Sequence, residues 1–240
     1  MGARLTSSRS ATSDAVAGKA HGSAGPVWSG WSYAPDVAHV QVPAARVERW
    51  VANFATRHGE TVLSAVDGAL AGTAADGSSF RARLPFDASY DGPADAAGFA
   101  AAAVAPADWG VLLVRKGGFA VARLRGPSLS ESKVGQRHVQ GRTKAGGQSQ
   151  QRFARRRDNQ ARQAYEAAAE HAARILSGLV GPVVTGGDRS AVTEVLADPR
   201  LRGLVVVEPW LAVPDPRRGV LEAAVEDACA VRVDVANAGS

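Results

Sequence analysis

The segment that decides the fold reads DWGVLLVRKGGFAVARL and spans residues 108–124. Trp109–Val114 is a continuous apolar run with the length of a buried strand, and Phe119–Leu124 is a second one. Between them, Lys116-Gly117-Gly118 predicts a tight turn, because glycine accepts the backbone angles that a short hairpin loop requires. We therefore expect an antiparallel hairpin inside a sheet, with a further strand over Lys133–Gln140.

An alternation of helices and strands follows this hairpin. Apolar residues recur every three or four positions from Ala161 to Leu179 and predict a long helix over about residues 149–178. Such an alternation is typical of a layered α/β domain with a mixed sheet. The later elements that we expect are a strand at Val183–Val184, a turn at Gly186–Asp188 with Asp188 as N-cap, a helix over Arg189–Leu196, a buried strand at Leu204–Val207 and a helix over Arg217–Ala228.

The chain before the hairpin divides into an arm and the start of a folded body. Residues 1–35 are small and polar apart from Trp28 and Trp31, so we expect a disordered arm there and one domain over residues 36–240. The body is expected to begin with a strand at His39–Val42 and a helix that ends at Gly59. Further expected elements are strands at Glu60–Val66 and Ser79–Leu84, and a loop or weak helix over Asp87–Ala107.

Composition narrows the class of protein. The chain has 240 residues and 1 cysteine, which excludes a disulfide scaffold and any cysteine-built metal site. It carries no apolar run long enough to span a bilayer and no secretory signal, so we expect a cytoplasmic protein without a membrane partner. The histidines have no partners at metal-ligand spacing, and we expect no metal.

Positive charge is concentrated in one segment, Lys133 to Arg162. It contains nine Lys or Arg residues against a single acid, Asp158. On a helix Arg152, Arg155, Arg156, Asn159 and Arg162 would share one stripe, separate from the apolar one. RNA phosphate would neutralise such a face, and a solvated basic helix is the alternative on charge alone.

The loop before that helix carries the chemistry. Gly146 and Gly147 let the main chain approach a crowded partner, and Gln148 follows them directly. A glutamine amide is no general base, but it can orient one water molecule and stabilise a transition state. The backbone N–H groups at a helix start also favour a developing oxyanion. Ester hydrolysis in a site built largely by another molecule fits this design, and a plain Gly/Gln/Ser linker is the alternative.

These residues also resemble a known family. Gly146-Gly147-Gln148-Ser149, followed by Arg152-Phe153-Ala154-Arg155 and Arg157, is similar to the catalytic loop and helix of eukaryotic and archaeal class I peptide-release factors. The order of elements over about Asp108–Ala230 also resembles the middle domain of that family. From about His39 the chain most resembles the Vms-like release factors of the actinobacterial type. That group is described by a Gly-x-x-Gln pattern, which Gly147-Gln148-Ser149-Gln150 also satisfies.

The resemblance implies an RNase H-like α/β core and a peptidyl-tRNA hydrolase activity. Gln148 is the favoured catalytic amide, and Gln150 is the alternative. Implied partners are the large ribosomal subunit at its peptidyl-transferase centre, peptidyl-tRNA and ribosomal RNA, with no cofactor and a monomeric protein. Nothing before the hairpin reads as a codon-reading domain, so rescue of stalled chains is implied; a non-catalytic ribosome-binding module is the rival. The RNA-binding residues would be Arg142, Lys144, Arg152, Arg155, Arg156 and Arg162.

The remaining polar residues have plainer interpretations. His138 is expected to contact RNA or the loop, and Cys229 to be a buried small hydrophobe. We expect a solvated acidic edge from Glu208, Asp215, Glu222, Glu226 and Asp227.

Overall fold

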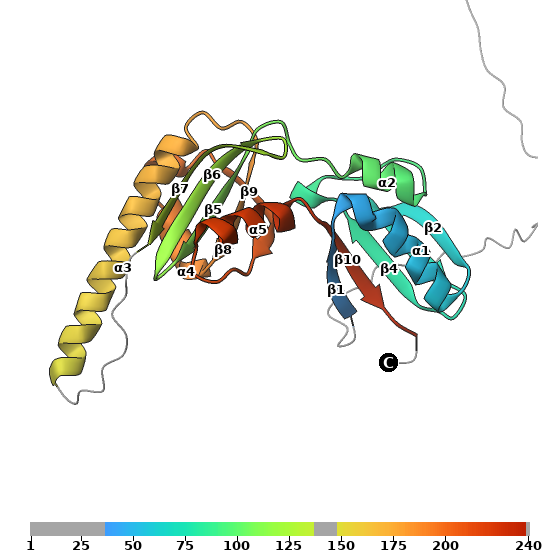
Figure 1. Cartoon of the computed structure of the whole chain (residues 1–240), viewed down its shortest axis with the longest axis horizontal. Coiled ribbons are helices and arrows are strands. Elements are labelled where there is room, and N and C mark those ends of the chain that lie inside the picture. Colours follow the sequence, from blue (N-terminus) through green and yellow to red (C-terminus); the bar gives the residue numbers. More distant parts are fainter. Residues whose placement is uncertain (1–36, 137–147, 239–240) are drawn as a thin grey trace, which may run out of the picture. The chain divides into compact units, whose positions relative to one another are not determined.

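The protein is built around two five-stranded sheets with helices packed against them (Figure 1). A computed structural model describes residues 37–136 and 148–238, and for residues 136 and 148–160 it describes the backbone path. The mixed α/β class is as predicted. The expected arm of residues 1–35, including Trp28 and Trp31, lies outside the described residues.

The first sheet contains the predicted hairpin, β5 (Trp109–Arg115) and β6 (Gly118–Arg125). Its strand order is β7-β6-β5-β8-β9. β7 (Ser128–Gln136) pairs antiparallel with β6, whereas β8 (Pro182–Gly187) and β9 (Val205–Leu211) run parallel to β5. The parallel strands are linked through α3 (Gln148–Ile175) and α4 (Arg189–Leu196), as crossover connections require.

Helices cover both faces of this sheet, which explains the uninterrupted apolar run of β5. Leu112 and Val114 pack in a core with α3 and α4, while Val111 and Leu113 pack in a second core with α5 (Arg218–Ala228). All four side chains are at most 1% exposed. A strand buried on both faces has no solvent side and therefore needs no alternating polar residues.

Two strand predictions in this sheet are wrong in detail. β7 begins at Ser128, five residues before Lys133, because Ser128–Ser132 pairs with β6 despite its polar sequence. The strand expected at Leu204–Val207 is not buried: Val205 is 60% exposed and Val206 is 45% exposed. β9 lies at the edge of the sheet, so its valines lack a neighbour on one side.

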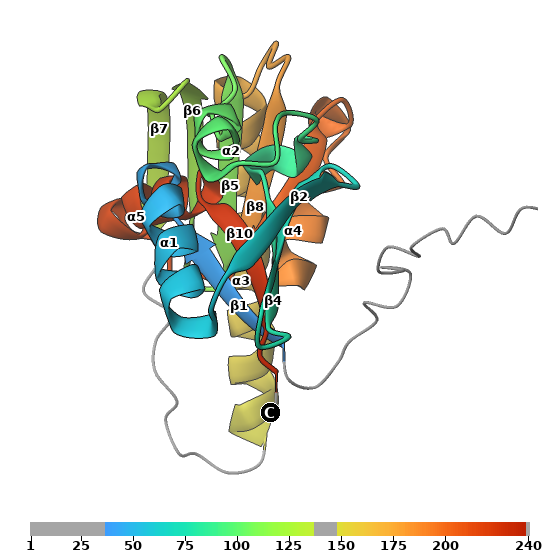
Figure 2. The ribbon, with the colours of Figure 1, turned by 90° about the vertical axis from the view of Figure 1, so that its right-hand side faces the viewer.

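The second sheet has the order β1-β10-β4-β3-β2, and every neighbouring pair is antiparallel (Figure 2). It comprises β1 (Val37–Val42), β2 (Thr61–Val66), β3 (Ala69–Ala74), β4 (Ser79–Arg83) and β10 (Val231–Ala236). We did not predict β3 or β10. β3 reads ALAGTA, a small-residue sequence without strand-forming side chains apart from Thr73. β10 lies between β1 and β4, so a C-terminal strand completes the N-terminal sheet.

Two helices cover one face of the second sheet. They are α1 (Val47–His58), which ends at Gly59 as predicted, and α2 (Ala96–Ala102) within the stretch expected to be a loop or weak helix. Gly59 has a φ of 92°, a value that favours glycine at a helix end. Phe54 of α1 meets Phe80 of β4 edge to face, with 5.0 Å between ring centres. Short 3-10 turns complete the fold at Ala44–Arg46, Pro85–Asp87 and Pro199–Leu201.

Candidate catalytic helix and its supports

The C-terminal half of α3 is packed tightly on the sheet. Its inward residues are small or aliphatic, and the helix can therefore lie close to β6 and α4. The apolar spacing predicted four of the buried residues of this half, whereas Ala161, the first residue of the predicted face, is only partly buried. With Ala164 and Ala169 added, the buried residues are Ala164, Tyr165, Ala168, Ala169, Ala172 and Ile175. This burial fixes the direction of the whole helix.

The N-terminal half of α3 extends beyond the sheet. The helix has 28 residues, which corresponds to a length of about 42 Å at 1.5 Å per residue. Figure 1 shows its first turns continuing past the ends of β6 and β7, and Figure 2 shows the same projection from the side. Because the helix begins at Gln148, its start lies about 20 Å from Arg162, the first basic residue of α3 with a described side chain.

The predicted site residues divide into two groups in this structure. Gln148 and Gln150 belong to the first turn of α3, with Arg152, Arg155 and Arg156 behind them on the same helix. Arg162, nearly two turns beyond Arg156, has an exposed side chain. Gly146 and Gly147 of the loop, together with Arg142, Lys144 and His138, lie outside the described residues.

An arginine clamp that the sequence did not reveal holds the other end of α3. Arg123 of β6 forms a bidentate pair with Asp108, with Nε to Oδ1 at 2.8 Å and Nη2 to Oδ2 at 2.7 Å. The same guanidinium donates to the Ser177 carbonyl at 2.7 Å, just past the helix C-terminus. Carbonyls at a helix end lack intrahelical donors, so a cation is favourable there. The hydrogen bonds from Arg123 lower the pKa of Asp108, and the pKa of Arg123 is raised in return.

Two further contacts join α3 to the strands beneath it. Arg174 forms an ion pair with Glu131 of β7. The His171 ring stacks on Phe119 of β6, with 5.6 Å between ring centres and an interplanar angle of 27°. His171 is therefore a packing residue of the helix base, and its buried Nδ1 has no hydrogen-bond partner among the described residues.

The turn after β8 does not act as we expected. Asp188 occupies the N-cap position of α4, but its side chain accepts no capping hydrogen bond. Its carboxylate instead lies 3.7 Å from Nη2 of Arg115. The same guanidinium has its Nε 3.5 Å from the Asp215 carboxylate, and its Nη1 donates to the Val213 carbonyl at 2.8 Å. Arg115 thus joins the loops that follow β8 and β9.

The predicted acidic edge is confirmed as solvent-exposed, and three of its five members also pair with arginines. Asp215 faces Arg115, Glu222 accepts from Arg218 at 2.6 Å, and Glu208 lies 3.8 Å from Arg232. Glu222 and Arg218 lie four residues apart on α5, whereas Asp215 and Glu208 pair with arginines that are distant in the sequence, so only the folded chain reveals these two pairs. Cys229 is partly buried, which raises the pKa of its thiol to about 11.

Two kinds of feature are absent from the part of the chain that the structure describes. Within it, no group of three or more His, Cys, Asp or Glu side chains could hold a metal ion. No helix in residues 37–136 or 148–238 combines the length and apolarity that crossing a membrane requires.

The comparisons with known proteins agree with this architecture. Residues 107–234 match the model of the family described as Actinobacteria/chloroflexi VLRF1 release factor. The match spans just over half of the chain and includes the first sheet, the whole of α3 and most of β10. No curated protein matched the chain. The chain therefore belongs to the actinobacterial and chloroflexi VLRF1 release factor family.

Proposed function

We propose that this protein is a ribosome-associated peptidyl-tRNA hydrolase that releases nascent chains from stalled ribosomes or large subunits without reading a stop codon. The observation that carries the proposal is the Gly146-Gly147-Gln148 sequence at the start of a long helix whose far half is anchored to a sheet. Membership of a release factor family supports it. The substrate would be the ester between a nascent peptide and the terminal ribose of tRNA, in the cytoplasm.

The proposed chemistry needs one positioned amide and one water molecule. The side-chain amide of Gln148 would orient water towards the ester carbonyl carbon, where the new C–O bond forms. The bond to the ribose oxygen then breaks, that oxygen takes up one proton of the attacking water, and the other proton passes to solvent. The products are a peptide carboxylate and deacylated tRNA. Free N–H groups in the first turn of α3 would favour the negative charge that develops on the carbonyl oxygen. Ribosomal RNA would supply the rest of the site, so the proposal requires no metal or cofactor.

Basic residues along the first half of α3 would bind RNA. Arg152, Arg155 and Arg156 lie between Gln148 and the exposed Arg162, on the part of the helix that extends past the sheet. Arg142 and Lys144 precede the glycines in sequence. Contacts from these residues to ribosomal RNA and to the acceptor end of tRNA would hold the glutamine at the reacting ester.

The decisive experiment is single-turnover cleavage of peptidyl-tRNA on purified stalled large subunits. We expect Gln148→Ala to lower the rate by about 10²–10³, the usual cost of losing one oriented donor in a transition state. Gln150→Ala tests the alternative glutamine, and Gln151→Ala is the matched control because it removes the same amide one residue further on. Full activity of Gln148→Ala beside an inactive Gln150→Ala would move the assignment by two residues. Full activity of both variants would refute this mechanism.

A binding measurement separates the enzyme from a non-catalytic ribosome-binding module. Replacing Arg155 and Arg156 together by alanine should weaken binding to large subunits and reduce the salt dependence of binding, by about 0.7–0.9 in log–log slope for each lost phosphate contact. Arg202→Ala is the control, since Arg202 is exposed and has no ion-pair partner among the described residues. Wild-type protein that binds with the expected slope but never releases peptide would favour the non-catalytic module.

A further inference from the structure

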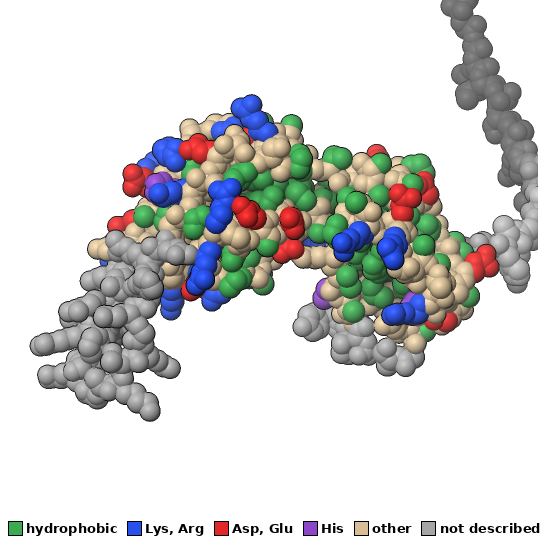
Figure 3. All heavy atoms as spheres, viewed as in Figure 1, with side chains coloured by type: hydrophobic (Ala, Val, Ile, Leu, Met, Phe, Trp, Pro, Cys, Tyr) green, Lys and Arg blue, Asp and Glu red, His purple; other side chains and the backbone are tan. Residues whose placement is uncertain are grey.

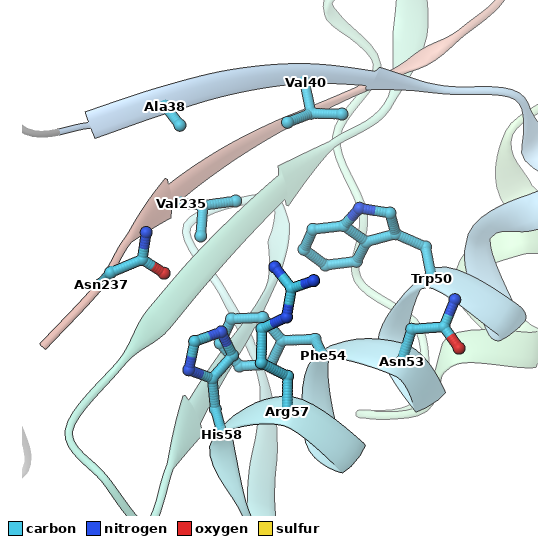
Figure 4. Close-up of a pocket in the computed structure, with 9 residues that line it drawn as sticks. All are labelled: Ala38, Val40, Trp50, Asn53, Phe54, Arg57, His58, Val235 and Asn237. Carbon is cyan, nitrogen blue, oxygen red and sulfur yellow. The ribbon is translucent and has the colours of Figure 1, made fainter.

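A pocket of about 350 Å³ opens between α1 and strands β1 and β10 of the second sheet (Figure 4). None of the residues that line it belongs to α3. Its floor is aromatic, formed by Trp50 and Phe54 of α1. Val40 of β1 and Val235 of β10 point towards these rings, so the pocket has two apolar walls. A slot between a ring and aliphatic side chains is suited to a flat, apolar-faced ligand.

The aromatic floor is held rigidly in place. Trp50 stacks on Phe54 with 5.7 Å between ring centres and an interplanar angle of 18°, and it meets Phe80 edge to face at 5.1 Å. The indole is nevertheless only partly buried and lines the opening. A ring that is fixed before binding loses little conformational freedom when a ligand stacks on it, which favours affinity.

Polar side chains surround this floor. Asn53 and Asn237 lie at opposite ends of the pocket, and the guanidinium of Arg57 extends between Trp50 and Val235 (Figure 4). None of these three side chains has a hydrogen bond or ion pair with another described residue. His58, in contrast, is engaged, because its Nδ1 lies 2.9 Å from Asp76. Within the described part of the chain, the pocket therefore presents one unpaired cation and two free amides, which can each donate and accept.

Positive charge continues from the pocket along α1. Arg49, Asn53 and Arg57 follow one another at intervals of four residues, which places them on one face of α1, and Arg46 lies directly before the helix, at the end of the 3-10 turn Ala44–Arg46. All three arginines are exposed, and none has an ion-pair partner among the described residues. Figure 3 shows Lys and Arg side chains gathered over the region of α1. Arg49 and Arg57 are about 12 Å apart along the axis, so this stripe can contact several charges of one polyanion.

We infer that this surface is a second RNA site, at which an unpaired base stacks on Trp50 while the adjoining phosphates lie along Arg46, Arg49 and Arg57. A nucleobase matches the pocket in its flat faces and in edges that both donate and accept hydrogen bonds, which Asn53 and Asn237 can read. The phosphates of a single strand also supply repeated negative charges, which can neutralise the row of arginines. The inference relies on the release factor family for RNA as the partner and is independent of the hydrolysis step.

Crosslinking locates the site directly in the full-length protein. A ten-nucleotide single-stranded RNA that contains 4-thiouridine is irradiated with the protein, which is then digested with trypsin. Cleavage after Arg49 and Arg57 releases the peptide Trp50–Arg57, which holds four of the pocket residues. We expect RNA attached to this peptide, and we expect Gln148→Ala to retain the crosslink, so that failure of this site and failure of the proposed catalysis can be told apart.

Fluorescence anisotropy with the same RNA measures how much each pocket residue contributes to the binding affinity. Stacking on an aromatic ring corresponds to about 5- to 150-fold in affinity, so Trp50→Leu should weaken binding by a factor in that range. Arg57→Ala should reduce the log–log salt slope by about 0.7, and the same RNA in a duplex should be insensitive to Trp50→Leu. Asn53→Ala alters an exposed side chain and tests the site without disturbing the core, and Arg202→Ala is the matched charge control. Absence of the Trp50–Arg57 crosslink, or wild-type affinity in Trp50→Leu, Asn53→Ala and Arg57→Ala, would overturn the inference.

Discussion

Replacing Arg123 by methionine tests how the C-terminal end of α3 is held. Methionine retains the aliphatic stem but removes the guanidinium that joins Asp108 at the start of β5 to the Ser177 carbonyl beyond α3. The substitution leaves a partly buried carboxylate without its partner and a helix-end carbonyl without its donor. Both losses destabilise the folded state, because unpaired polar groups away from water are costly.

The size of the effect follows from the geometry. The Arg123 and Asp108 side chains are 24% and 26% exposed, so solvent screens the pair only in part. Hydrogen bonds to charged groups contribute about 1.5–3 kcal/mol when buried, whereas exposed pairs contribute about 0–1 kcal/mol. For a bidentate pair with an added carbonyl contact, we expect a loss of about 2 kcal/mol in the free energy of unfolding. For a domain of this size that corresponds to a fall in Tm of about 4–8 °C.

Urea denaturation followed by circular dichroism measures this loss. A double-mutant cycle with Asp108→Asn isolates the pairwise term, for which we expect a coupling of about 1–1.5 kcal/mol at neutral pH. The Arg123 hydrogen bonds depress the pKa of Asp108 in the folded state below the ordinary value of 3.8. A carboxyl group with a depressed folded pKa stabilises the protein above its unfolded pKa and loses that stabilisation as the pH falls. The coupling should therefore be constant from about pH 5 to 8 and fade below about pH 4.

Two results would refute this reasoning about the clamp. One is a coupling below about 0.3 kcal/mol at pH 7, which would make the pair equivalent to an exposed surface contact. The other is a coupling that increases on acidification, which is the opposite sign to that required by a lowered carboxyl pKa.

Two further predictions concern packing and reactivity. Gly181→Ala would place a Cβ atom 1.7 Å from the backbone oxygen of Asp108, and since backbone cannot move aside cheaply, we expect a loss of about 3 kcal/mol or more in urea denaturation. Gly203→Ala is the control, because a Cβ atom at Gly203 would meet nothing within 4 Å, and we expect its free energy of unfolding to change by no more than about 0.5 kcal/mol. Equal stability of the two variants would contradict the packing at Gly181. Burial raises the pKa of the Cys229 thiol to about 11, so at pH 8 only about one molecule in a thousand carries the thiolate. Alkylation by iodoacetamide, followed by mass spectrometry, should be slow in the native protein and fast in urea, and rapid native labelling would show that the thiol is not buried.

Elements with strong local patterns were predictable from the sequence. The hairpin of β5 and β6 is specified by two apolar runs and a glycine turn within 17 residues, so its pairing needs no distant part of the chain. The apolar spacing from Ala161 onward likewise identified the buried face of α3, because helix periodicity is a local property. Gly146, Gly147 and Gln148 were identified by their sequence motif. Such a motif suggests which residues could take part in a reaction, but not where they lie in the fold.

The sequence pattern did not indicate which distant segments of the chain pair with one another. β10 completes a sheet with β1 from the other end of the chain, and His39 meets Asp234 at 2.7 Å across 195 positions. The alternation of Val231, Val233 and Val235 is typical of a strand, but no local feature of the sequence indicates which strands it pairs with. The edge position of β9 is of the same kind, since strand order depends on how the whole sheet assembles.

The residue types of the candidate site were readable from the sequence, where Gly146-Gly147-Gln148 precedes a run of arginines, because side-chain groups and charge are properties of single residues. The tertiary structure alone decided how that helix is held and where its start lies. Arg123, Asp108 and Ser177 come from three separate segments, and their contact exists only after the sheet and α3 have packed together. The same holds for the pocket over Trp50, where α1, β1 and β10 meet. Burial and proximity between distant residues are collective results of folding, and no local pattern encodes them.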